Sequence, residues 1–156
     1  MKENKDTVII GLGNPICSDD GVGIKVAEMI KKIKKDIEVK FSFRGGFELL
    51  DLLKGFKRAV IIDALDIPEP NPGRVRKLGI NNFSGSPRLV SVHEIDLLTA
   101  VNFGRLIGYQ MPKDIEIYAV EAEDTKTISE RLTPKVEEVV VPLANRIVKE
   151  LEEQGG

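Results

Sequence analysis

Two short apolar runs constrain the fold of this chain more than any other feature. They are TVIIGLG (7–13) and AVIIDAL (59–65), and neither alternates between apolar and polar residues. Strands with such runs are covered on both faces, as in parallel sheets that lie between helices. Three further strands are predicted: IEVKFSF (37–43) and GRVRKLG (73–79), which alternate, and DIEIYAVEA (114–122), with GRVRKLG at a sheet edge.

Helical patterns separate these strands along the chain. Helices are predicted over 22–35, 47–55 and 94–108. A last helix is predicted to begin at Pro134, with Thr133 as its cap, and to reach about residue 153. Pro142 should kink or interrupt that helix. The expected inward stripes are Val22, Val26, Met29, Ile30 and Ile33 in the first helix, and Leu97, Leu98, Val101 and Leu106 in the third.

This alternation of strands and helices predicts an α/β fold, with a mostly parallel sheet between two helical layers. The length of 156 residues fits one domain over 1–156, and no internal repeat or linker interrupts it. Segments 67–73 and 81–87 are predicted loops, and RLVSV (88–92) is predicted to be short and extended.

Composition narrows the classes of function. A net charge of −2 and one basic cluster argue against a nucleic-acid partner. That cluster (Lys31, Lys32, Lys34 and Lys35) fits a solvated helix end better than a phosphate site. Cys17 is the only cysteine, which excludes an intrachain disulfide or a zinc-type cysteine pair. With no signal-peptide pattern and no run of about 18 apolar residues, we expect a soluble cytoplasmic protein without a membrane partner.

The loop GLGNPICSDDGVG (11–23) joins the first strand to the first helix. Its glycines suggest a dinucleotide fingerprint, but no glycine stands at position 16, and two acidic residues would repel a pyrophosphate. An aspartate at a helix start is explained by capping. Capping requires only one of Asp19 and Asp20, so the other is free to project into a crevice.

Asp63 and His93 complete a candidate site with Asp20. Asp63 stands near the carboxyl end of a buried strand, where parallel sheets bind ligands, and it is favoured over Asp66 in the following loop. His93 is the only histidine. Taken singly, each residue has a structural explanation as a cap or a loop residue. All three fall at predicted strand-to-helix junctions, and two carboxylates with one imidazole suit a divalent transition metal.

Other catalytic arrangements find little support. Cys17 would need a base to act as a nucleophile, and none remains if His93 contacts a metal. The chain also lacks a GxSxG elbow, an HExxH helix and a P-loop.

Several segments together resemble the hydrogenase maturation endopeptidases. VIIGLGNPICSDDGVGIKVAEMI is similar to the family's opening motif, and RGGFELLDLL to its glycine turn and short helix. AVIIDAL carries the family aspartate as Asp63, and SVHEIDLLTAV carries the family histidine as His93. LTPKVEEVVVPL resembles the last helix, so the likeness covers nearly the whole chain.

This resemblance implies an endopeptidase that removes a C-terminal peptide from the nickel-loaded large-subunit precursor of nickel–iron hydrogenase. Asp20, Asp63 and His93 would be its catalytic and nickel-contacting residues, with nickel supplied by the substrate and the resting enzyme free of metal. Some members have glutamate in place of Asp20, which is shorter by one methylene. The implied fold is a three-layer α/β/α sandwich whose sheet has one antiparallel strand, for which GRVRKLG is the candidate.

Two other readings stay open at the level of sequence. A nickel-binding chaperone or checkpoint protein for hydrogenase assembly would use the same three ligands without cutting. GLGNP also opens the peptidyl-tRNA hydrolases, but this chain has SDDGVG where that family has its catalytic histidine segment.

Overall fold

A computed structural model describes residues 6–43, 45–79 and 92–154, and for 92–96 it describes the backbone alone. Within these residues one sheet contains β1 (Thr7–Leu12), β2 (Glu38–Ser42), β3 (Arg58–Leu65), β4 (Val75–Gly79) and β5 (Asp114–Glu121). The strand order is β2-β1-β3-β5-β4. Strands β1, β2, β3 and β5 run parallel, and β4 pairs with β5 in the antiparallel direction. The predictions of a mostly parallel α/β sheet and of GRVRKLG as the antiparallel edge strand are therefore confirmed.

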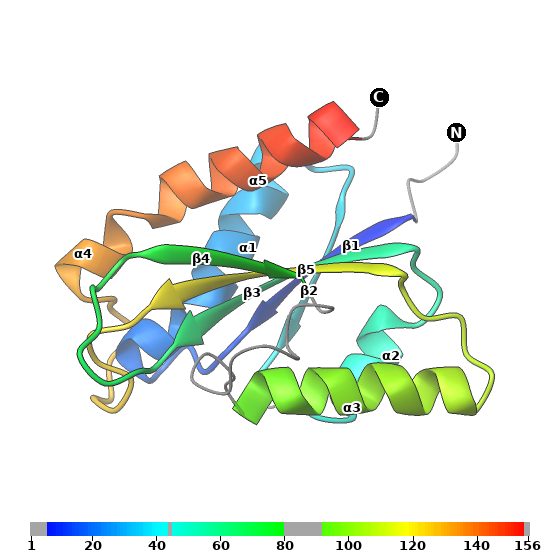
Figure 1. The fold of residues 1–156 in the computed structure, drawn as a ribbon. Coiled ribbons are helices and arrows are strands. Elements are labelled where there is room, and N and C mark those ends of the chain that lie inside the picture. Colours follow the sequence, from blue (N-terminus) through cyan, green and yellow to red (C-terminus); the bar gives the residue numbers. More distant parts are fainter. Residues whose placement is uncertain (1–5, 44, 80–91, 155–156) are drawn as a thin grey trace.

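Helices lie on both faces of this sheet (Figure 1). Helices α1 (Val22–Ile33) and α5 (Val140–Gln154) pack on each other on one face. Helices α2 (Glu48–Leu53) and α3 (Val92–Leu106) cover the opposite face. A 3-10 turn, η1 (Ser18–Gly21), precedes α1, and the short helix α4 (Pro134–Glu137) precedes α5. The three-layer arrangement is the one expected from the alternating pattern.

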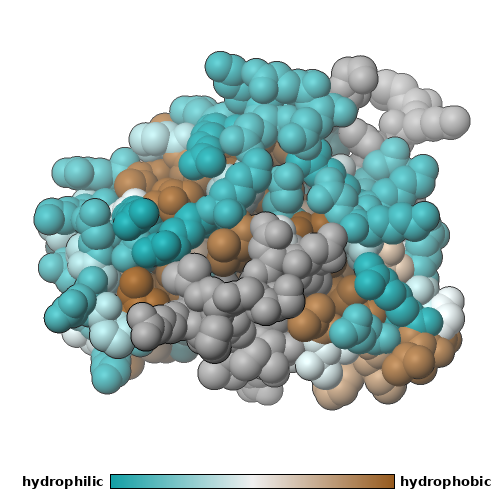
Figure 2. Space-filling view, in the orientation of Figure 1, coloured by the Kyte–Doolittle hydropathy of each residue, from teal (hydrophilic) through white to brown (hydrophobic). Residues whose placement is uncertain are grey.

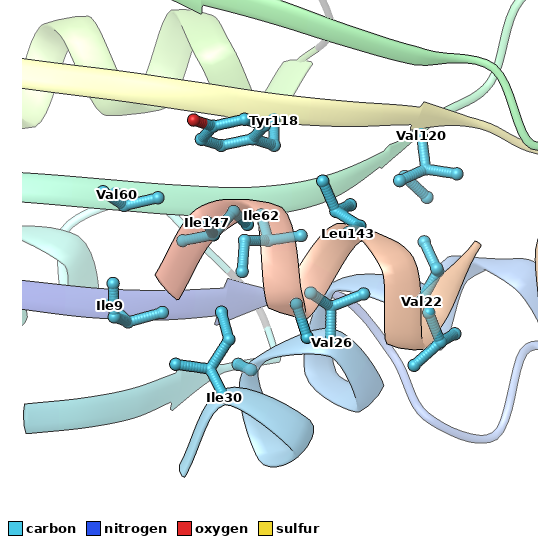
Figure 3. Packing of buried hydrophobic residues seen from close by; sticks show 14 of the residues in the cluster. Ile9, Val22, Val26, Ile30, Val60, Ile62, Tyr118, Val120, Leu143 and Ile147 are labelled. Atoms are coloured by element: carbon cyan, nitrogen blue, oxygen red, sulfur yellow. The ribbon is translucent and has the colours of Figure 1, made fainter. Parts of the chain in front are cut away.

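Alternate residues of the central strands divide the core between the two faces. Ile9, Val60 and Ile62 belong to the cluster beneath α1 and α5, which Figure 3 shows in close view. Val8 and Ile61 face the other way, into the cluster beneath α2 and α3. The apolar runs thus bury both sides of each strand, which explains why they lack alternation.

Parts of the expected helical stripes are wrong. Ile33 is 43% exposed and Leu106 is 85% exposed. Each is the last residue of its helix, so no further turn continues the packed stripe beyond it. Leu98 is 37% exposed because the buried face of α3 follows Leu97, Ala100 and Val101, and a neighbouring position lies about 100° away.

The C-terminal helical region is divided as its proline predicted. Pro142 stands in the first turn of α5, and the helix is broken between Glu137 and Val140. Proline has no N–H to donate to the carbonyl four residues earlier, and its ring clashes there. The helical region begins at Pro134 with Thr133 at the N-cap position, as predicted, although the Thr133 side chain makes no capping hydrogen bond.

The surface is polar over most of one side and apolar at one end of a helix. Hydrophilic side chains dominate the region over α5, and hydrophobic surface gathers at the end of α3 nearest β5 (Figure 2). Leu106 and Ile107 are exposed there. Among the described residues, no helix is both long enough and apolar enough to cross a bilayer.

Candidate functional site

The order of the strands places a topological switch point between β1 and β3. From β1 the chain passes through α1 to β2, which lies on one side of β1 in the sheet. It then returns through α2 to β3, which lies on the other side of β1. The connections on the two sides cross opposite faces of the sheet (Figure 1). In open α/β sheets, ligands bind outside the carboxyl ends of the strands at such a switch point. Asp20 follows β1 and Asp63 belongs to β3, so the two predicted carboxylates come from the two elements that flank it.

Gly23 allows the start of α1 to lie directly on the ends of these strands. A Cβ built on Gly23 would lie 2.1 Å from the carbonyl oxygen of Ile62 and 2.5 Å from that of Leu12. No side chain fits at such distances, so the backbone approach requires glycine. The turn η1 packs against β3 in consequence. Asp20 lies three residues before Gly23, and Asp63 lies one residue after Ile62, so this close approach gathers the two carboxylates at one edge.

Asp20 is half-buried in η1, and the loop before it holds its carboxylate. The N–H of Asn14 donates a hydrogen bond to Oδ2 of Asp20 over 2.8 Å. Gly13, at φ 134°, allows this loop to fold closely on Asp20, because a Cβ there would lie 1.9 Å from the Asp20 carbonyl oxygen. The side chain therefore has one fixed oxygen, and it does not cap α1, whose N-cap is Gly21.

Asp63 is 4% exposed and lies within β3 rather than at a junction with a helix. The prediction of a strand-to-helix junction is wrong for this residue, because β3 continues to Leu65 and is followed by a loop and β4. Its Oδ1 accepts a hydrogen bond from the N–H of Ala64 over 2.8 Å. Its place near the carboxyl end of a central strand agrees with the prediction.

Asp19 has a structural role that the sequence did not reveal. Its carboxylate is fully buried and accepts hydrogen bonds from the N–H groups of Glu123, Asp124 and Thr133 and from the Thr133 hydroxyl, over 2.7–3.0 Å. These groups belong to the segment that joins β5 to α4. The prediction that one aspartate of the pair caps α1 is therefore wrong: Asp19 ties a distant segment to η1, and the N-cap of α1 is Gly21.

The segment that Asp19 holds also has internal order. Asp124 accepts hydrogen bonds from the Thr127 hydroxyl and from the N–H groups of Thr127 and Lys126, in that order of effect, and they lower the pKa of its carboxyl below the ordinary value. Thr125 donates from its hydroxyl to Asp66 over 3.2 Å. Asp66 is thus an exposed partner of this loop, in line with the lower rank that the sequence assigns to it.

His93 is the second residue of α3, and its side chain lies outside the described part of the structure. The predicted extended segment 88–92 and loop 81–87 also lie outside it, except that Val92 is helical. Among the side chains that the structure describes, no three acidic, histidine or cysteine residues form a metal-binding group. The role of His93 as third partner of the carboxylates therefore stays a prediction.

Residues 44–150 match the family model described as hydrogenase maturation protease. The chain belongs to this family. Hydrogenase 2 maturation protease of Escherichia coli is 23% identical over 95% of this chain and 92% of its own length. The hydrogenase expression/formation protein HupD of Thiocapsa roseopersicina is 20% identical over 99% of this chain and 72% of its own length.

Solved structures share the fold. The hydrogenase maturating endopeptidase HybD of E. coli superimposes with a TM-score of 0.78 at 24% identity, covering 96% of this chain and 93% of its own. The [NiFe] hydrogenase maturation protease HybD of Thermococcus kodakarensis gives 0.75 at 22% identity, over 93% and 97% of the two chains. The expected membership of the hydrogenase maturation protease family and the expected α/β fold are both confirmed.

The residue types of the candidate site are ones that bind cations in other proteins. Carboxylate oxygens are hard ligands for divalent metals, and an imidazole would add a nitrogen ligand that nickel accepts. A buried carboxylate (Asp63) and a half-buried one (Asp20) can also orient water or accept a proton. Cys17, by contrast, is held through its backbone: it forms a parallel bridge with Ser129, and its N–H donates a hydrogen bond to the Asn14 carbonyl over 3.1 Å.

Proposed function

We propose that this protein is the endopeptidase that removes the C-terminal peptide from a nickel-loaded hydrogenase large-subunit precursor. The observation that carries the proposal is the division of labour between the two neighbouring aspartates. The Asp19 carboxylate accepts four hydrogen bonds from a distant segment, whereas the Asp20 carboxylate accepts one, from the N–H of Asn14. Asp20 belongs to η1, which packs against β3, the strand that carries Asp63. Family membership and the names of the relatives, which are maturation proteases, support the same activity.

In this proposal Asp20, Asp63 and His93 contact the nickel that the substrate carries. The enzyme then recognises a precursor by completing the coordination of a metal already inserted. Two carboxylates and an imidazole form a donor set that fits a divalent transition metal with open positions. Recognition through the metal would also ensure that cleavage follows insertion, because a nickel-free precursor would lack the group that binds.

Cleavage in this scheme is hydrolysis without a covalent acyl-enzyme. Water adds across the scissile C–N bond: its oxygen bonds to the carbonyl carbon, and the leaving nitrogen takes a proton. A metal polarises a carbonyl and activates water, so no side-chain nucleophile is required. Cys17→Ala should therefore retain activity, and an acyl-enzyme trapped on Cys17 would contradict the scheme.

The decisive experiment mixes the protein with nickel-loaded and nickel-free precursor and follows precursor mass. Loss of a C-terminal peptide only from the nickel-loaded form, abolished by Asp20→Asn or His93→Ala, is the expected result. Asp66→Asn is the matched control, since this carboxylate is exposed and bonded to Thr125. Tight binding without a mass change would indicate a chaperone instead, and cleavage of the nickel-free precursor would refute metal recognition.

A further inference from the structure

Two large aliphatic side chains are exposed beside the candidate site. Ile16 is 49% exposed and Ile128 is 76% exposed. A parallel bridge between Cys17 and Ser129 brings their segments together. The N–H of Ser129 donates to the Ile16 carbonyl over 3.0 Å, and the N–H of Ser18 donates to the Ser129 carbonyl over 2.9 Å. Because each isoleucine precedes a bridging residue, the two lie side by side on neighbouring parallel segments.

A short chain of hydrogen bonds links this pair to Asp20. The N–H of Asn14 donates to Oδ2 of Asp20 over 2.8 Å, and the N–H of Ile16 donates to Oδ1 of Asn14 over 3.1 Å. The carbonyl of Ile16 then accepts the bond from Ser129. The loop that positions one of the proposed nickel contacts thus also carries Ile16, and it positions Ile128 through the bridge.

Both isoleucines are held by fixed backbone. Asp19 ties the β5–α4 segment to η1 at Glu123, Asp124 and Thr133, on either side of Ile128. Asp124 orders the turn just before Ile128 through its bonds to Lys126 and Thr127. A preorganised apolar group loses little entropy when a partner covers it, so such positions favour binding.

The surroundings of the pair are polar. Lys126, Glu130 and Arg131 are exposed and charged on the same segment. An apolar centre with a polar rim is the usual anatomy of a protein-binding patch. Two side chains are far too small for a stable interface between two copies, which needs about 1,000 Å² of buried surface. They match instead one or two side chains of a peptide that is also held elsewhere.

We propose that Ile16 and Ile128 form a docking surface for an extended segment of the hydrogenase precursor close to the cleaved bond. The segment places an aliphatic or aromatic side chain on the isoleucine pair while the nickel-bearing part lies at Asp20 and Asp63. This inference rests on the proposed function, because it names a second contact for the same substrate. The pair then adds affinity and sets the register of that segment, while the carboxylates contact the nickel.

The test is steady-state cleavage of nickel-loaded precursor by the double variant Ile16→Ser/Ile128→Ser. KM should rise about tenfold, the usual range for lost apolar contacts in a substrate pocket, with kcat within about twofold of the wild type. The matched control is Ile33→Ser/Val141→Ser, which removes exposed aliphatic groups from α1 and α5. It should leave both constants unchanged, and Ile16→Leu/Ile128→Leu should keep KM near the wild-type value.

Each other outcome refutes the docking surface. An unchanged KM in the double serine variant, an equal rise in the control, or a fall in kcat alone would each do so. If the wild type cleaves no nickel-loaded precursor, the proposed function fails instead. Calorimetric titration of that precursor into wild type and variants then decides the docking surface separately: weaker binding by the serine variant supports it, and equal binding overturns it.

Discussion

Neighbouring residues of one type have opposite roles in the loop before α1. The carboxylate of Asp19 accepts four hydrogen bonds in a fully buried position. An amide in its place turns an N–H donor toward groups that are themselves donors. We expect Asp19→Asn to lower the free energy of unfolding by about 2–4 kcal/mol, because hydrogen bonds to a buried charge are the costly ones to lose. Urea unfolding followed by circular dichroism measures the change.

Asp20→Asn is the companion variant to that experiment. Asp20 is half-buried and accepts one backbone hydrogen bond, so its substitution should change stability by less than about 1 kcal/mol. Cleavage of nickel-loaded precursor should nevertheless be lost. If Asp20→Asn unfolds as easily as Asp19→Asn, the two aspartates do not divide structural and functional roles.

The sequence indicates that capping a helix requires only one of the two adjacent aspartates. It does not indicate which of the two has a structural role and which is available for the site. The difference depends on Glu123, Asp124 and Thr133, which lie more than a hundred positions away from Asp19. No local pattern contains such a contact. The position of Asp63 could be predicted, because the apolar run before it marks a buried strand and Asp63 lies near the carboxyl end of that strand. Its role in the site stays a prediction.

At the scale of elements, the contact between α1 and the strand ends is the most demanding one. Gly23→Ala would place a methyl group 2.1 Å from the Ile62 carbonyl oxygen, which is backbone and cannot rotate away. We expect a loss of about 3 kcal/mol in the free energy of unfolding, at the upper end of overpacking effects. Thermal denaturation followed by calorimetry measures it, and the surviving folded protein should cleave poorly because η1 is displaced from β3.

Gly104→Ala is the control for that variant, since Gly104 is also inside a helix. Its nearest neighbours are side-chain atoms of Met111, which is flexible and can move. Replacing glycine by alanine favours the helix by about 1 kcal/mol in both variants. The difference in stability between the two variants therefore measures the clash at Gly23. Equal stability of the two variants would show that the strand ends tolerate displacement of α1.

The packing of α5 on the sheet edge depends on a charged group. Glu150 of α5 accepts hydrogen bonds from the Tyr118 hydroxyl, Lys77 and Arg146. Burial by itself raises the pKa of Glu150, but these three donors together lower it to about 2, from an ordinary value of 4.5. Burial also raises the pKa of Tyr118, to about 12, and Glu150 adds to the effect. The hydrogen bond that the Lys77 ammonium donates to Glu150 raises the pKa of Lys77.

This network predicts how stability depends on pH in acid. A carboxylate whose pKa is lowered by folding stabilises the protein above its unfolded pKa and loses that effect as it is protonated. As the pH falls from about 4.5 to about 2, protonation of Glu150 should lower the free energy of unfolding by about 1–2 kcal/mol. This loss is smaller than the full pKa shift implies, because the side chain is partly solvated. Melting temperatures should fall less steeply across this range in Glu150→Gln. Glu152→Gln, at an exposed ion pair with Lys34, should retain the wild-type slope.

Elements were predictable where one physical rule acts alone. The strands follow from apolar runs, and the break before α5 follows from Pro142. Side-chain capping by Thr133 was not borne out, because Asp19 competes for the same hydroxyl. The inward stripe was wrong at Ile33 and Leu106, where the helix ends and the periodic pattern has no way to show it. Errors thus arise where a distant segment or an element boundary decides.

At the scale of the whole molecule, the alternation of strands and helices was enough to predict the layers, but not the order of the strands. The order β2-β1-β3-β5-β4 places the reversal of connections between β1 and β3. This reversal, rather than any motif, brings η1, which follows β1, against β3, the strand that carries Asp63. The same topology explains why a site can be assembled from residues that are 43 positions apart in sequence, as Asp20 and Asp63 are.

The last prediction concerns the whole enzyme and its supply of metal. If nickel arrives with the substrate, the resting protein needs none for its fold or its activity. Protein treated with a strong chelator and then desalted should cleave nickel-loaded precursor at the untreated rate, and its melting temperature should not change. A two-state metalloprotein would instead be destabilised by metal removal.

The control for this experiment is treatment of the precursor rather than the enzyme. Chelation that strips nickel from the precursor should abolish cleavage, and reloading the precursor should restore it. Loss of activity in the chelated enzyme, recovered by adding nickel to the enzyme alone, would place the metal in the resting protein. In that case Asp20 and Asp63 would belong to a resident metal centre, and recognition of a loaded precursor would need a different explanation.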